Sequence, residues 1–187
     1  MGIEASYWRV TPKQFAEFQS NPETAPSFFT FINLNELDFS KPQEIVARLQ
    51  ERKNSGSYLS LGKDWQALHF LLTEELAFVG KSQVQPPLCN VVMGGTPTNF
   101  EATYGVIRYL TPDEVKEVAE ALSQISVNDL QQRFDSSAFN AAEIYPNPQT
   151  GGWDEEEIEV LFEVYPKLVE FFKQSAKEGD IILISFD

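Results

Sequence analysis

The only histidine in the 187-residue chain, His69, lies in the segment Gly62–Thr73, which reads GKDWQALHFLLT. An imidazole can act as a general base near neutral pH when it reaches a substrate and a carboxylate orients its ring. If this segment is helical, Trp65, Leu68 and Leu72 fall on the same face as the histidine. That arrangement favours a packed residue whose ring nitrogen is bonded to a carbonyl or a carboxylate. A general base at the edge of a cleft is the alternative.

Arg108 is the second candidate for chemistry, because it lies on a predicted strand just before a helix start in an otherwise acidic chain. Its guanidinium group is suited either to an anionic ligand or to a structural ion pair with Glu143 or Asp64, and the ion pair is favoured. Tyr145 is a candidate pocket wall, or a core anchor whose hydroxyl group is hydrogen-bonded. If the chain has a site, we expect it to gather five residues: Trp65, His69, Arg108, Glu143 and Tyr145.

Other familiar chemistry finds little support in the sequence. The chain has no nucleophile elbow, no phosphate loop and no dinucleotide glycine fingerprint, and we interpret Gly94-Gly95-Thr96 as a plain turn. One histidine and one cysteine exclude a zinc site built from several such ligands. The acidic stretch 154–163 begins a predicted helix, where adjacent carboxylates diverge and the helix dipole favours negative charge. We therefore expect no metal site and no cofactor.

Three helix starts and three strands frame the predicted fold. Each helix start has an N-cap and a reciprocal capping partner three positions later: Thr11 with Gln14, Thr111 with Glu114, and Asp154 with Glu157. Residues 3–10 and 103–110, before the first two caps, are rich in β-branched and aromatic residues, which predicts strands. Residues 180–186 are almost continuously apolar, which indicates a strand covered on both faces in the middle of a sheet.

The remaining segments are assigned from hydrophobic periodicity and from glycine and proline. Helices are predicted at 42–52, 64–76, 112–123, 127–134, 137–143 and 154–177. Pro166 falls inside the last of these, so we expect a kink there or two abutting helices. Surface loops are predicted at 80–87, 94–97 and 146–152. No segment is long or biased enough to serve as a linker between two domains.

The composition restricts the classes of partner. The net charge is −14, from 28 acidic and 14 basic residues. Nucleic acid is bound largely through lysine and arginine, which displace counterions from phosphate, so nucleic acid and anionic membranes are poor partners. No apolar run approaches the roughly 20 residues that span a bilayer. Cys89 is the only cysteine, which precludes an intrachain disulfide and is typical of a reducing, cytoplasmic compartment.

The segment GKDWQALHFLLT resembles the Lys-x-Trp-x-x-Leu-His-x-Leu-Leu-Thr motif of the YfbM-like proteins, a bacterial family of unknown function (domain of unknown function family 1877). The similarity continues in YGVIRYLTPDEV at 104–115, in EIYP at 143–146 and in the late helix that ends near Gly179. It spans nearly the whole chain. The resemblance implies one α+β domain over residues 1–187, with a small mixed or antiparallel sheet packed by several helices. It implies no activity.

The chain departs from the family motif at two positions beside the histidine segment. Gly62 stands where an acidic residue commonly precedes the lysine, and Glu74 stands where a glycine commonly follows the threonine. If the acidic residue were a catalytic partner of His69, its absence here would be hard to explain. This departure weakens the interpretation of the chain as an enzyme.

Two functional hypotheses follow. We favour a non-enzymatic, acidic, cytoplasmic protein that binds another protein; a basic partner matches its charge, and an inhibitor or immunity role is compatible with it. The alternative is a hydrolase-like enzyme for a small ligand, with His69 as the general base and Arg108 as the anion binder. The enzyme requires His69 in an open pocket within reach of a carboxylate and of Arg108. The binding protein is expected to keep His69 packed away.

Overall fold

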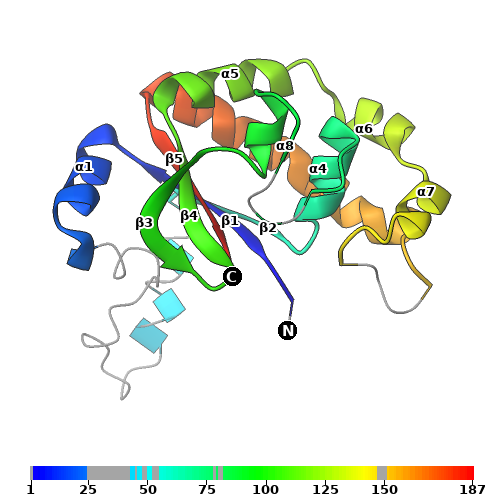
Figure 1. Ribbon diagram of the computed structural model, residues 1–187, viewed down its shortest axis with the longest axis horizontal. Helices are drawn as coiled ribbons and strands as arrows, with labels where there is room; N and C mark the ends of the chain where they lie inside the picture. The colour runs from blue at the N-terminus through cyan, green and yellow to red at the C-terminus, as the bar shows by residue number, and fades with distance from the viewer. Residues whose placement is uncertain are drawn as a thin grey trace.

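The β-sheet of this protein is antiparallel throughout. The computed structural model describes residues 2–24, 43–44, 46–47, 50–51, 55–77, 79, 82–146 and 151–187. Within these residues five strands are hydrogen-bonded in the order β2-β1-β5-β4-β3. They are β1 (Ala5–Val10), β2 (Tyr58–Gly62), β3 (Thr96–Ala102), β4 (Gly105–Leu110) and β5 (Ile181–Phe186). The C-terminal strand β5 lies between β1 and β4 (Figure 1).

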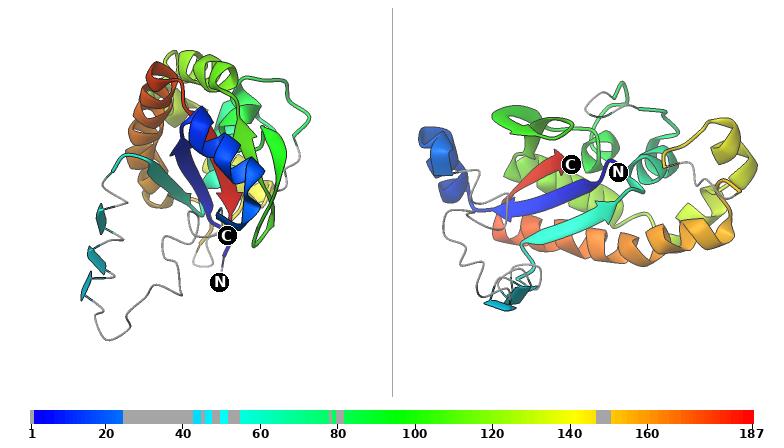
Figure 2. Two further views of the ribbon diagram at one scale, coloured as in Figure 1. Left: turned by 90° about the vertical axis from the view of Figure 1, so that its left-hand side faces the viewer. Right: turned by 90° about the horizontal axis from the view of Figure 1, so that it is seen from below.

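Helices cover the two faces of this sheet unequally. The described helices are α1 (Pro12–Ser20), α4 (Trp65–Thr73), α5 (Pro112–Leu122), α6 (Val127–Arg133), α7 (Ser136–Ala141) and α8 (Glu155–Glu178), with the short 3₁₀ segments η1 (Pro22–Thr24) and η3 (Leu88–Val91). α4, α5 and α8 pack on one face, and α1 packs on the other (Figures 1 and 2). The predicted α+β class is confirmed. In the described part of the chain, no helix combines the length and the apolar character needed to cross a membrane.

The central strand β5 joins two hydrophobic clusters. Because successive side chains of a strand point to opposite faces, Ile182, Ile184 and Phe186 belong to the larger cluster beneath α4, α5 and α8. Ile181 and Leu183 belong to the smaller cluster, which also contains apolar residues of β1 and α1. All six residues of β5 are buried. The uninterrupted apolar pattern of this segment thus has the predicted cause, a strand covered on both faces.

The sequence does not predict β2 and β3, which are the two edge strands. β3 reads TPTNFEA, and its first residues, Thr96 and Pro97, fall in the loop predicted at 94–97. The loop assignment is therefore wrong at these two positions. An edge strand tolerates proline and polar side chains because one side of its backbone has no partner in the sheet. Such a strand lacks the apolar pattern on which its prediction would depend.

The predicted helix starts are largely confirmed. Thr11 and Thr111 begin α1 and α5 with complete capping boxes and a proline in the first turn. Asp154 accepts hydrogen bonds from the backbone N–H groups of Glu156 and Glu157, both at 2.9 Å. The structure shows no reciprocal bond from the Glu157 side chain to the cap, so the third box is only half formed. An N-cap of this kind stabilises its helix by about 1 kcal/mol.

The long helix α8 continues without interruption through Pro166, so the alternative of two abutting helices is wrong. The proline removes one backbone donor, but the neighbouring side chains Leu161, Tyr165 and Leu168 are buried in the core on both sides of it. Their packing holds the helix together across the missing bond. The helix predicted at 42–52 and the loop predicted at 146–152 lie partly outside the described residues; the described positions of the former are helical.

Candidate functional site

His69 lies in the middle of α4 and has no exposed surface. Its Nε2 atom is 3.0 Å from Oε2 of Glu75, a residue just beyond the end of the helix. Its Nδ1 atom is buried without a hydrogen-bond partner among the described residues. Burial lowers the pKa of the imidazole, although the bond to Glu75 opposes this effect. Because a carboxylate only accepts hydrogen bonds, we assign a neutral ring with its proton on Nε2.

Glu75 ties the segment after α4 back to the helix. Its carboxylate accepts hydrogen bonds from Oγ of Ser82 at 2.5 Å and from the backbone N–H of Gln83 at 2.6 Å, in addition to the bond from His69. The bond from Ser82 is the main cause that lowers the pKa of Glu75 to about 2, while burial acts in the opposite direction. The carboxylate is therefore ionised at neutral pH and bonded to three donors, although its side chain is partly exposed.

Arg108, on β4, is only 4% exposed. Its guanidinium group donates hydrogen bonds to the backbone carbonyls of Val92, at 3.0 Å, and of Met93. Burial lowers its pKa to about 10, so the group remains charged at neutral pH. The predicted ion pair with Glu143 or Asp64 is wrong. The two carbonyls replace a carboxylate because they point into the core, where they need a donor of their own.

Tyr7 holds the same segment from β1, a role that sequence reasoning does not detect. Its hydroxyl group donates to the carbonyl of Val91 at 2.6 Å, and burial raises its pKa. Together with Arg108, it engages three consecutive carbonyls at the end of η3. The bond of Tyr7 joins residues that are 84 positions apart in the chain, and the two bonds of Arg108 join residues that are 15 and 16 positions apart. Spacing within one segment gives no signal for them.

Trp65 and Tyr145 fix the start of β1. Nε1 of Trp65 donates to the carbonyl of Ile3 at 2.9 Å, and the hydroxyl group of Tyr145 accepts a hydrogen bond from the N–H of Ile3 at 2.5 Å. The two rings are stacked with their centroids 5.3 Å apart. Trp65 is buried and Tyr145 is half-buried. Both polar atoms therefore serve the backbone of one residue.

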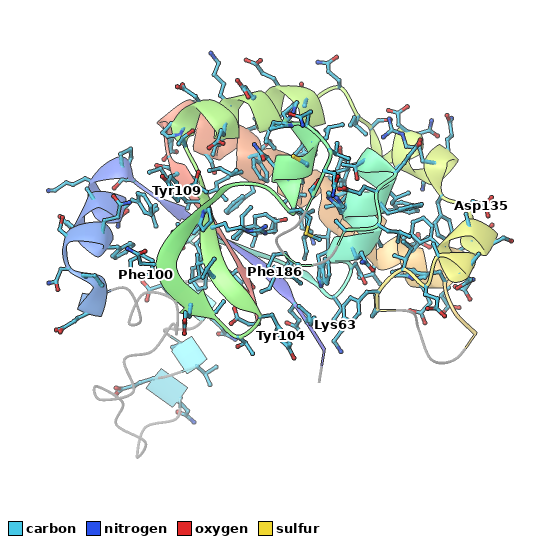
Figure 3. The ribbon with its side chains drawn as sticks, in the orientation of Figure 1. Lys63, Phe100, Tyr104, Tyr109, Asp135 and Phe186 are labelled. Carbon is cyan, nitrogen blue, oxygen red and sulfur yellow. The ribbon has the colours of Figure 1, made fainter. Side chains whose placement is uncertain are left out.

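Of the five candidate residues, Trp65 and Tyr145 contact each other, whereas His69 and Arg108 are each bonded to other groups. Glu143 is exposed and adopts a left-handed conformation, with φ of 52°, after α7. His69 is bonded to Glu75, whereas Arg108 is bonded to the carbonyls that follow η3. The guanidinium carbon of Arg108 is 5.4 Å from the ring centroid of Phe186, which is labelled in Figure 3. The polar atoms of these side chains form hydrogen bonds that hold neighbouring loops to the core. The arrangement has no exposed imidazole or guanidinium that would meet a substrate.

Cys89 and Asp64 are two further groups that the structure perturbs. Burial raises the pKa of the Cys89 thiol, whereas reactive cysteines have a lowered pKa. Asp64 occupies the N-cap position of α4, but its side chain makes no hydrogen bond to the helix. Burial, and then the negative charge of Glu157, raises the pKa of Asp64 to about 6. Among the described residues, no three His, Cys, Asp or Glu side chains gather closely enough to hold a metal ion.

Comparison with known proteins places this fold in a family. The family model described as "Domain of unknown function (DUF1877)" matches residues 1–185. The chain belongs to this family. Among solved structures, the chain is similar to the crystal structure of YfbM from Escherichia coli, a protein of unknown function. The TM-score is 0.62 and the sequence identity is 17%, over 97% of this chain and 98% of that chain. Comparison with curated proteins finds no match.

Membership of the DUF1877 family confirms the resemblance to YfbM-like proteins that the motifs indicate. At 17% identity, the likeness to YfbM shows a common fold and nothing about activity. The function of this DUF1877 protein must therefore be argued from the chemistry of its own surface.

Proposed function

We propose that this protein is a cytoplasmic binding protein, without a catalytic centre of its own, that recognises a basic partner protein. The two side chains best suited to catalysis support this proposal by their buried positions. His69 has no exposed surface, and Arg108 is held by backbone carbonyls. An inhibitor or immunity protein is one form that such a binding protein takes. The single buried cysteine, Cys89, suits a reducing compartment.

The observation that carries the proposal is the acidic face on the first half of α8. All its acidic side chains are exposed: Asp154, Glu155, Glu156, Glu157, Glu159 and Glu163. No lysine or arginine occurs between positions 154 and 166. Val160 is 55% exposed among them. Glu156, Glu157 and Glu163 lie three or four positions from this valine and are its neighbours on the helix surface. Glu159 in turn neighbours Glu156 and Glu163 by the same spacing.

An acidic face around an apolar residue suits a partner that presents lysine or arginine beside an apolar side chain. Complementary charge accelerates association and selects against partners of the wrong sign. The exposed valine adds a small apolar contact at the centre of the charged ring. A helix start alone needs fewer carboxylates, since the dipole effect fades within the first turn. Glu159 and Glu163 lie beyond that turn.

The test is affinity capture from the native host with three forms of the protein. The first variant replaces Glu155, Glu156, Glu159 and Glu163 by glutamine; Glu157 is retained because it interacts with Asp64. The matched control removes four negative charges elsewhere, through the substitutions Glu101→Gln, Asp113→Asn, Glu117→Gln and Glu120→Gln, all at exposed positions. Both variants therefore have the same net charge. We expect a basic protein to be captured by the wild type and the control but to be lost with the α8 variant.

Salt dependence provides a second measure of the same interaction. Raising the salt concentration from about 0.05 M to 0.3 M should release the partner, because the Debye length falls from above 10 Å to well below it. Capture of the same basic protein by the α8 variant at the wild-type level would contradict the proposal. Equal loss with the control variant would also contradict it, since the effect would then follow net charge and not this face.

A further inference from the structure

The second half of α8 passes the edge strand β2 (Figure 2). A groove lies between side chains of these two elements. It consists of two adjoining hollows, each with a volume of about 490 Å³. The hollows share Arg9, Gly56 and Gln174, which join them into one continuous depression. Pockets for small ligands have volumes of about 300–1,000 Å³. The groove is therefore large enough for two amino-acid side chains and the backbone between them.

One half of the groove is apolar. Its walls include Tyr58 and Leu59 of β2 and Pro166 and Phe171 of α8. Pro166 is exposed, and Tyr58 and Leu59 are half-buried, so this surface extends from the core into solvent. An apolar side chain that entered here would be removed from water on several sides.

The other half of the groove is polar and negatively charged. Arg9 forms ion pairs with Asp180 at 2.7 Å and with Glu178 at 2.9 Å. One positive charge thus faces two carboxylates, and the Glu178 side chain is 51% exposed. The C-terminal end of α8 at Gly179 adds the negative pole of the helix dipole. This half of the groove therefore favours a cation over an anion.

We propose that this groove binds an extended segment of the partner in which an apolar residue is followed by lysine or arginine. The apolar side chain occupies the wall formed by Leu59 and Phe171, and the cationic group lies beside Glu178. The inference rests on the proposed function, because it assigns this segment to the same basic partner. It adds a second binding surface on α8, about ten residues beyond the centre of the acidic face.

The probe is the blocked dipeptide N-acetyl-phenylalanyl-lysine amide, titrated into ¹⁵N-labelled protein and followed by NMR. We expect binding with a Kd of about 1 mM and shifts of the amide signals of Gly56, Leu59 and Gln174. N-acetyl-phenylalanyl-glutamate amide tests the charge, and its Kd should be at least about threefold higher. N-acetyl-glycyl-lysine amide tests the apolar half, and its Kd should be about tenfold higher or more.

Variants of α8 localise the site. Glu170 lines the apolar half of the groove and Glu178 the polar half. The double substitution Glu170→Gln with Glu178→Gln should raise the Kd of the phenylalanyl-lysine probe about threefold or more. The matched double substitution Glu159→Gln with Glu163→Gln removes the same charge from the same helix, outside the groove, and should leave the Kd unchanged. Retention of the wild-type pattern of amide signals verifies that each variant is folded.

Three outcomes would overturn the inference: no shifts at about 10 mM probe, equal affinity for the lysine and glutamate probes, or shifts confined to the acidic face. Failure of the groove leaves the proposed function standing if capture still depends on Glu155, Glu156, Glu159 and Glu163. Conversely, a probe that binds the groove does not rescue the proposed function if no basic partner depends on that face.

Discussion

The two ends of α4 bear carboxylates whose pKa values move in opposite directions. The pKa of Asp64, before the first turn, is raised to about 6 by burial and then by Glu157. The pKa of Glu75, just past the last turn, is lowered to about 2, chiefly by the hydrogen bond from Ser82. The helix dipole alone would produce the reverse order, since it stabilises negative charge at the N-terminus and destabilises it at the C-terminus.

This contrast shows that local hydrogen bonding and burial outweigh the dipole of a short helix. The backbone of Asp64, with φ of −84° and ψ of 13°, lies outside the extended region typical of N-caps, and its side chain makes no bond to the helix. Glu74, with φ of 59°, turns the chain at the other end. The turn brings the Glu75 carboxylate to three donors. One carboxylate therefore destabilises the fold at neutral pH, whereas the other stabilises it.

The largest expected effect is that of the substitution Glu75→Ala. It leaves the Nε2–H of His69, the hydroxyl of Ser82 and the N–H of Gln83 without their common acceptor. We expect the free energy of unfolding to fall by about 2–3 kcal/mol at pH 7, chiefly because the buried N–H of His69 keeps its desolvation penalty, whereas Gln83 is exposed to water. Urea titration measures the change, with the exposed substitution Glu163→Ala as a control that should alter stability by less than about 0.5 kcal/mol.

The pH dependence of this effect has a defined sign. A carboxylate whose pKa is lower in the folded than in the unfolded protein contributes its stability above the unfolded value, which is 4.5 for Glu75. The contribution is lost as the pH falls from 4.5 towards 2. The difference between the wild type and Glu75→Ala should therefore narrow over this range. A difference that stays constant down to pH 3 would show that the carboxylate charge is not the cause.

The sequence predicts most of the framework on which this contrast depends, but not the contrast itself. The apolar run of β5 and the Thr-Pro starts of α1 and α5 are local patterns, and each is confirmed. The spacing within α4 correctly places His69 on the same face as buried Trp65 and Leu68. The hydrogen-bond partners of the side chains in α4 depend instead on which distant segments of the chain pack against this helix.

Arg108 illustrates what local patterns leave open. A buried guanidinium needs acceptors, and the sequence suggests carboxylates because they carry the opposite charge. The structure uses the carbonyls of Val92 and Met93, whose availability depends on the turn after η3. Nearly every residue carries the same backbone carbonyl, so the residue type does not indicate which carbonyl will point into the core. The same limit applies to Trp65 and Tyr145, which meet at Ile3.

The second prediction is that Asp64→Asn stabilises the protein at pH 7. A rise in pKa from 3.8 to about 6 corresponds to about 3 kcal/mol of penalty for the charged form, and partial exposure reduces this to about 1–2 kcal/mol. Asparagine has nearly the same shape and no charge, so it avoids the penalty. Thermal and urea unfolding measure the gain. Asp154→Asn is the matched control at the N-cap of α8, where asparagine preserves the cap and stability should change by less than about 0.5 kcal/mol.

The sign of the pH effect is opposite to that of Glu75. A carboxyl group with a raised pKa in the folded protein binds its proton more tightly there than in the unfolded chain. The penalty is therefore complete above pH 6 and is relieved as the pH falls from 6 to 3.8. The advantage of Asp64→Asn should shrink across this interval and vanish near pH 4. An advantage that grows with acid would mean that the charge of Asp64 is stabilising.

The smallest expected effect is that of Glu74→Gly at the C-terminal end of the same helix. The backbone N–H of Glu74 closes the last turn on Phe70 at 2.7 Å, and its side chain is exposed. A left-handed residue with a Cβ atom is strained by about 1 kcal/mol. Glycine relieves this strain but makes the unfolded chain more flexible, at a cost of about 0.5 kcal/mol. The net gain in the free energy of unfolding should be about 0.5 kcal/mol.

This substitution tests whether the backbone turn at position 74, without the Glu74 side chain, is enough to place the Glu75 carboxylate. If the turn alone brings Glu75 to its donors, glycine at position 74 should preserve the bonds from His69, Ser82 and Gln83 and keep the pKa of Glu75 near 2. NMR titration of the Glu75 carboxyl carbon measures this directly. A rise of that pKa towards 4.5, or a loss of stability above about 0.5 kcal/mol, would show that the Glu74 side chain itself holds the end of α4. The contrast between the two carboxylates would then depend on three residues and not on two.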